Sequence, residues 1–102
     1  MSNGPIESQI INTLSSSMNL SSFKIINESF MHNVPDGSES HFKILVVTDD
    51  FNNVPIIQRH KLIYKNLNGL MDKIQALSIH AFTEEEFELN PVILDSPECA
   101  NK

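Results

Sequence analysis

The spacing of apolar residues changes from helical to strand-like along this chain, and that change constrains the fold more than any other feature. Apolar residues first recur at every fourth position: Ile6, Ile10, Leu14 and Met18. This spacing, opened by Pro5, predicts an amphipathic helix over residues 5–17. Strict alternation of side chains follows from Phe23 and again from His41 to Thr48, which predicts two strands.

The turn-rich segment at residues 33–38 predicts that these two strands form an antiparallel hairpin. A second helix is expected from about Ile57 to Ile74, with a kink or break over residues 66–69. A third strand is expected over residues 74–81. Thr83 and Glu86 then have the spacing of a capping box at the start of a last helix. The predicted order is αββαβα, an α+β arrangement.

The length of 102 residues suits one small domain. We expect a flexible N-terminus at residues 1–4, a folded domain at residues 5–89 and a mobile tail at residues 90–102.

Several functional classes are disfavoured by composition. No apolar run approaches the ~20 residues that span a bilayer, and the first residues have no basic or apolar segment typical of secretion, so a cytoplasmic protein without membrane contact is expected. Cys99 is the single cysteine, so it cannot form an intrachain disulfide, and a metal site would need ligands from elsewhere. No nucleophile–base pair or carboxylate pair is apparent, so neither catalysis nor a small-molecule substrate is expected.

The charge is distributed unevenly. The net charge is −6, but residues 55–75 carry a local +3 from Arg59, Lys61, Lys65 and Lys73 against Asp72. Lys61 and Lys65 are four residues apart and share a helix face, whereas Arg59 projects elsewhere. These four cations are the candidates for contact with nucleic acid. The alternative is an ordinary solvated helix face.

Three motifs resemble those of the BolA family: ESFMHNVPDGSESHFK at residues 28–43, FNN at 51–53 and RHKLIY at 59–64. The tail SPEC at residues 96–99 is also similar, so the likeness covers residues 5 to 99. The resemblance implies a class II KH-like domain, with a three-stranded mixed sheet and helices packed on one face. No Gly-x-x-Gly loop typical of RNA-binding KH domains is present.

The resemblance implies two activities. Some BolA proteins are stress-linked transcriptional regulators that bind DNA. Others pair with a monothiol glutaredoxin around a two-iron, two-sulfur cluster, which glutathione and the glutaredoxin cysteine also ligate. We therefore expect this chain to hold no cofactor by itself, and to bind a two-iron, two-sulfur cluster only when it shares that cluster with glutaredoxin and glutathione.

The resemblance also identifies candidate residues for the glutaredoxin partner. His32 and His41 flank the hairpin loop, and His32 is the candidate metal ligand. The family's main ligand histidine is replaced here by Gln75, and amide groups are poor iron ligands, so weak cluster ligation is expected. His80 lies five residues beyond Gln75 on the same predicted strand, which places it on the opposite face.

Four further residues belong to the family's structural signature: Phe51, Asn53, His60 and Tyr64. Asn53 stands where the family usually has glycine, and asparagine tolerates the positive φ of such a turn. His60 is expected to bond a neighbouring carbonyl near the start of the helix. Tyr64 is expected to bury its ring beneath His60 and to keep its hydroxyl hydrogen-bonded.

Overall fold

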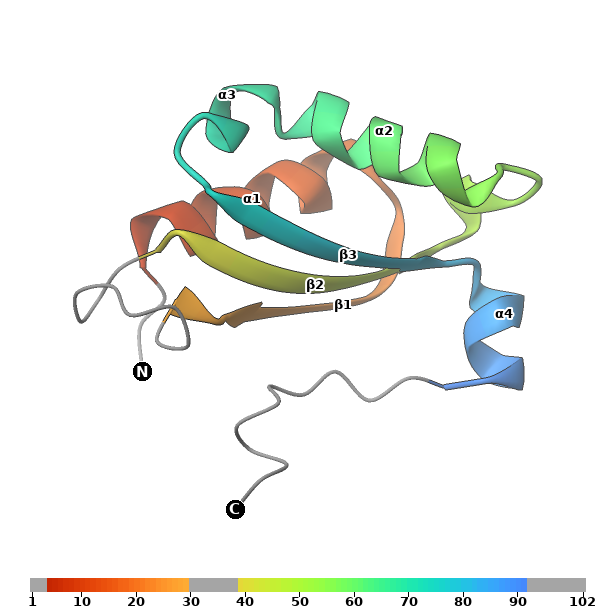
Figure 1. The fold of residues 1–102 in the computed structure, drawn as a ribbon. Helices are drawn as coiled ribbons and strands as arrows, with labels where there is room; N and C mark the ends of the chain where they lie inside the picture. The colour runs from red at the N-terminus through yellow and green to blue at the C-terminus, as the bar shows by residue number, and fades with distance from the viewer. Residues whose placement is uncertain (1–3, 30–38, 92–102) are drawn as a thin grey trace, which may run out of the picture.

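The computed structural model describes residues 4–29 and 39–91, which form an α+β fold with a three-stranded sheet. The elements follow the chain in this order (Figure 1): α1 (Pro5–Ser17), β1 (Leu20–Asn27), β2 (His41–Thr48), the 3₁₀ turn η2 (Asp49–Phe51), α2 (Ile56–Asn66), α3 (Asn68–Met71), β3 (Ala76–Phe82) and α4 (Glu84–Leu89). Predictions about His32, the first residues and the tail beyond Pro91 fall outside the described residues.

The sheet is mixed, with strand order β1-β2-β3. β1 pairs antiparallel with β2, which places Ile25 opposite Ile44 and confirms the predicted hairpin. β3 pairs parallel with β2, with Ile44 opposite Ile79. Parallel pairing needs a crossover connection, which α2 and α3 supply.

Helices α1, α2 and α3 cover one face of the sheet (Figure 1). The core lies between these layers and includes Ile10 and Leu14 of α1, Ile44 of β2 and Ile63 of α2, all fully buried. The spacing of four residues between Ile10 and Leu14 places both on the buried side of α1, as the sequence pattern predicts.

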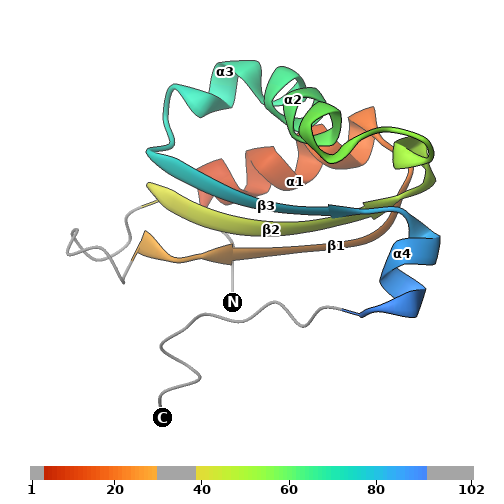
Figure 2. The same cartoon turned by 45° about the vertical axis from the view of Figure 1, so that its right-hand side comes forward.

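Helix α4 lies at one end of the sheet, away from the other three helices (Figure 2). Phe87 of α4 and Phe82 of β3 pack against Leu45 and Val47, which point to the face opposite the main core. The prediction of helices on one face of the sheet therefore holds for α1, α2 and α3. The short helix α4 instead covers one end of the other face.

The predicted break in the second helix is confirmed. α2 ends at Asn66, and α3 begins at Asn68 after Leu67, whose φ of −98° and ψ of 17° leave the helical region. The capping box of Thr83 and Glu86 is also present at the start of α4. Among the described residues, no helix has both the length and the apolar character that crossing a bilayer requires.

Candidate functional site

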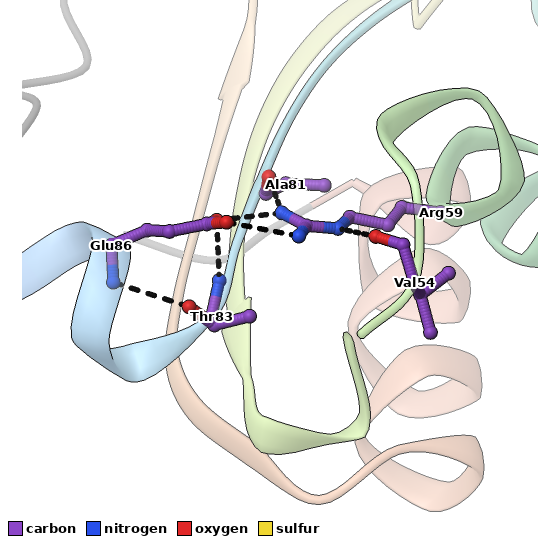
Figure 3. A network of polar contacts seen from close by, with 5 residues as sticks. All are labelled: Val54, Arg59, Ala81, Thr83 and Glu86. Atoms are coloured by element: carbon purple, nitrogen blue, oxygen red, sulfur yellow. Dashed lines mark hydrogen bonds and ion pairs between the residues drawn. The ribbon is translucent and has the colours of Figure 1, made fainter. Parts of the chain in front are cut away.

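Helix α2 carries cations on opposite sides, and the inward one is Arg59. Its side chain is buried, with 5% of the residue exposed. Its guanidinium donates two hydrogen bonds to the carboxylate of Glu86, at 2.6 and 3.0 Å, and one to the carbonyl of Ala81 at 3.1 Å (Figure 3). Its Nε donates to the carbonyl of Val54 at 2.7 Å.

This network joins α2 and the loop before it to the end of β3 and the first turn of α4, which lie 22 and 27 residues further along the sequence (Figure 3). The same Glu86 carboxylate accepts the backbone N–H of Thr83, which completes the capping box. The hydrogen bonds from Arg59 and then from Thr83 lower the pKa of Glu86 from 4.5 to about 2. The guanidinium also lies over the buried ring of Phe51, 5.7 Å from its centroid.

These contacts correct the assignment of Arg59 to a nucleic-acid surface. A guanidinium that is already bound by a carboxylate and two carbonyls inside the protein has no side turned toward a phosphate. Arg59 instead holds α4 to the rest of the fold, so its own role within the RHKLIY motif is structural.

Lys61 and Lys65 lie on the outer side of α2. Both are exposed, and neither forms an ion pair or a side-chain hydrogen bond within residues 4–29 and 39–91. With 3.6 residues per turn, they fall about 40° apart around the helix axis, while Arg59 points to the other side. The two lysines therefore form an exposed cationic stripe.

Lys73 is also exposed, but it lies beyond the end of α3. It lines a groove of about 380 Å³ between α1 and the α2–α3 junction, together with Gln9, Thr13 and Asn66. Its position is thus separate from α2, and we do not group it with Lys61 and Lys65.

One of the signature predictions, that for Asn53, is confirmed, and two are wrong. Phe51 is fully buried, and Asn53 has a φ of 64°, the left-handed conformation expected of it. Tyr64, however, is 41% exposed rather than buried. His60 is half-buried, and its ring makes no hydrogen bond within the described part of the chain.

A second candidate site lies where β2 and β3 begin. The hydroxyl of buried Ser29 accepts the backbone N–H groups of Ser40 and His41, at 2.9 and 3.1 Å, and so closes the base of the hairpin loop. The carbonyl of Ser40 accepts the N–H of Gln75 at 2.8 Å. These bonds bring His41 and Gln75 to the same edge of the sheet, where β2 and β3 begin. The Nδ1 of His41 also lies 2.8 Å from the Ser40 hydroxyl.

His80 is not part of this edge. It pairs with Leu45, four residues along β2 from His41, which corresponds to about 13 Å along a strand. The described residues contain no group of three His, Cys, Asp or Glu side chains that could hold a metal ion. Within residues 4–29 and 39–91, His41 and Gln75 are therefore not joined by further ligands that would complete a metal site.

One contact at this end of the molecule was not predictable from sequence spacing. Helix α1 has no side-chain cap of its own, and the carboxylate of Glu39 instead accepts the backbone N–H groups of Ile6 and Glu7, at 3.1 and 2.9 Å. Burial, and then the nearby charge of Glu39, raise the pKa of Glu7. A cap supplied from more than thirty residues away leaves no local signal.

The chain matches the BolA-like protein family over residues 14–86. A BolA-like protein of Dictyostelium discoideum is 43% identical over 89 residues, which are 85% of this chain and 78% of that protein. A protein of Vibrio cholerae named DNA-binding transcriptional regulator BolA is 46% identical over 78 residues, 74% of each chain. The solution structure of mouse BolA1 superposes with a TM-score of 0.85 at 35% identity and covers 97% of this chain and 81% of its own. The chain belongs to the BolA family.

Proposed function

We propose that this chain is a non-enzymatic DNA-binding regulator that contacts the phosphate backbone through Lys61 and Lys65 of α2. The observation that carries this proposal is the exposed cationic stripe, whose two ammonium groups are not neutralised by any described residue. The name of the Vibrio cholerae relative supports the same function.

The chemistry of such contacts predicts how binding behaves. Each lysine that neutralises a phosphate releases a counterion, so affinity falls steeply as salt rises. Two lysines give a modest affinity and carry no sequence information by themselves. The acidic remainder of the chain, with Glu84, Glu85 and Glu88 exposed on α4, disfavours contact through other surfaces.

The test is retention of the protein on duplex DNA at low salt. Replacing both lysines by glutamate is expected to abolish retention while the circular dichroism spectrum and thermal midpoint stay unchanged. The matched control is Lys24→Glu with Lys102→Glu, which alters net charge equally and leaves α2 intact. Retention of the α2 double variant equal to that of the wild type would show that the stripe is not the site.

A second candidate function is adaptor to a monothiol glutaredoxin in iron–sulfur trafficking. The observation that favours it is the common edge formed by His41 and Gln75 at the base of the hairpin loop. On this proposal the cluster is shared cargo, because its remaining ligands come from the glutaredoxin and glutathione. Gln75 in place of histidine makes ligation weak.

Visible circular dichroism of the protein mixed with a cluster-loaded glutaredoxin tests this candidate. The wild type is expected to change the cluster spectrum little, and Gln75→His is expected to produce a stable new spectrum that is lost again in Gln75→His with His41→Ala. An unchanged spectrum with Gln75→His would remove this edge from consideration. A stable wild-type spectrum lost in His32→Ala would place the ligand in the hairpin loop instead.

A further inference from the structure

We propose that the outer face of α2 binds single-stranded nucleic acid, with the ring of Tyr64 stacked on an unpaired base beside phosphates held by Lys61 and Lys65. This inference rests on the proposed nucleic-acid function and specifies its substrate class.

The first observation is the position of the ring. Tyr64 lies three residues after Lys61 and directly before Lys65, and all three are exposed. With 3.6 residues per turn, Ile57, Lys61, Tyr64 and Lys65 fall within an arc of about 100° on α2. Arg59 and Ile63 lie on the opposite side, where both are buried.

The second observation is the exposure of the ring and the lack of a hydrogen-bond partner for its hydroxyl among the described residues. Tyr64 is 41% exposed, whereas every described phenylalanine is buried or half-buried. Its hydroxyl makes no hydrogen bond within residues 4–29 and 39–91. Ile57, two turns before Tyr64 on the same side of α2, is 67% exposed.

The combination of a 41% exposed tyrosine with two neighbouring cations fits an unpaired strand better than a duplex. In a duplex the faces of the bases are stacked on each other and are not accessible to a ring outside the helix. In a single strand each base offers a face, and stacking on an aromatic side chain adds to the phosphate contacts. That addition is needed here, because two lysines on a protein of net charge −6 give little electrostatic affinity.

The chain contains one tyrosine and no tryptophan, so its intrinsic emission reports on this ring alone. Titration with an oligothymidylate is expected to quench that emission, and a fluorescein-labelled copy gives the affinity by anisotropy. A duplex of matched length and label is titrated in parallel at the same salt concentration.

Three variants separate stacking from charge and from folding. Tyr64→Ala is expected to weaken single-strand binding about tenfold, as loss of one stacked base does. Tyr64→Phe is expected to bind as the wild type does, because it keeps the ring. Tyr64→Leu is the matched control: it keeps a branched apolar side chain without an aromatic face, and it is expected to behave as Tyr64→Ala does.

The outcomes distinguish this inference from the function on which it rests. Selective loss of single-strand binding in Tyr64→Ala and Tyr64→Leu supports the inference. Binding of both nucleic acids through the lysines, with no quenching and no effect of Tyr64→Ala, overturns it and leaves the DNA-binding function intact. Failure of the wild type to bind either nucleic acid at low salt overturns both.

Discussion

Arg59 and Lys61 are two residues apart on α2, yet they face different environments. Arg59 points inward and binds Glu86 and two carbonyls, so its charge stabilises the connection between α2, β3 and α4. Lys61, like Lys65, points outward and contacts no described acid. The comparison teaches that a basic segment in a sequence can contain one structural cation and two that remain available to a ligand.

The largest expected effect on the free energy of unfolding comes from removing the contacts of Arg59 on the inner side of α2. Arg59→Met leaves the carbonyls of Val54 and Ala81 without their donor, and the Glu86 carboxylate without its partner. Leaving the two carbonyls without a donor, together with losing the partly exposed ion pair, costs about 3 kcal/mol. Urea unfolding measures this loss.

The outward control for that experiment is Lys61→Met, expected to change the free energy of unfolding by less than about 0.5 kcal/mol. Equal effects of Arg59→Met and Lys61→Met would contradict the division of α2 into an inner and an outer side.

A smaller effect is expected from Glu86, and it depends on pH. Its folded-state pKa of about 2 lies below the ordinary 4.5, so the charged form contributes stability above pH 4.5 that is lost as pH falls toward 2. Glu86→Gln removes that contribution. The difference in thermal midpoint between wild type and variant is therefore expected to shrink from pH 6 toward pH 2, because the Glu86 carboxylate becomes protonated within this range.

The partly exposed position of Glu86 limits the size of this effect, because solvent screens the pair. Glu88→Gln, an exposed change on the same helix, is the control and is expected to show no such trend. A wild-type advantage that stayed constant down to pH 2 would mean that Arg59 does not hold the Glu86 carboxylate ionised.

The cap that Glu39 provides for α1 lies outside the Arg59 network. Removing it shows how much this other end of the molecule contributes to the free energy of unfolding. Glu39→Ala removes the acceptor for two backbone N–H groups, a loss of about 1 kcal/mol. It also removes the charge beside Glu7, so the pKa of Glu7 is expected to fall when followed by NMR titration. A pKa of Glu7 that did not change would place the Glu39 carboxylate away from the helix end.

The smallest effect on stability is expected from the outward side. Lys61→Gln with Lys65→Gln should leave the free energy of unfolding within about 0.5 kcal/mol of the wild type. The same variant should lower the slope of log affinity for duplex DNA against log salt by about 2. An unchanged slope would show that these two lysines do not contact the phosphate backbone.

Much of the fold was predictable because it depends on local patterns. The four-residue spacing from Ile6 to Met18 specifies a helix and its buried side, and the alternation from His41 to Thr48 specifies a strand, which is buried on both faces. Asn53 and the capping box of Thr83 are also local, so residue type and spacing were sufficient.

The site was less predictable because its contacts join distant segments. The sequence shows Arg59 beside two lysines, but only the fold brings the first turn of α4 to its guanidinium. The exposure of Tyr64 likewise depends on which side of α2 meets the sheet. A family motif indicates that these residues belong together in the sequence, without saying which of them face inward.

Helix α4 has only six residues, too few to be stable as an isolated helix, so its order depends on the contacts it makes with Arg59, Leu45 and Val47. Its amides should therefore open as one small cooperative unit, before β2 and at a lower free energy. Native-state hydrogen exchange would follow that opening at Phe87 and Asn90, whose N–H groups close the helix. The exchange rates of these two amides would thus report on how firmly Arg59 and the apolar contacts hold α4, while the rest of the domain stays folded.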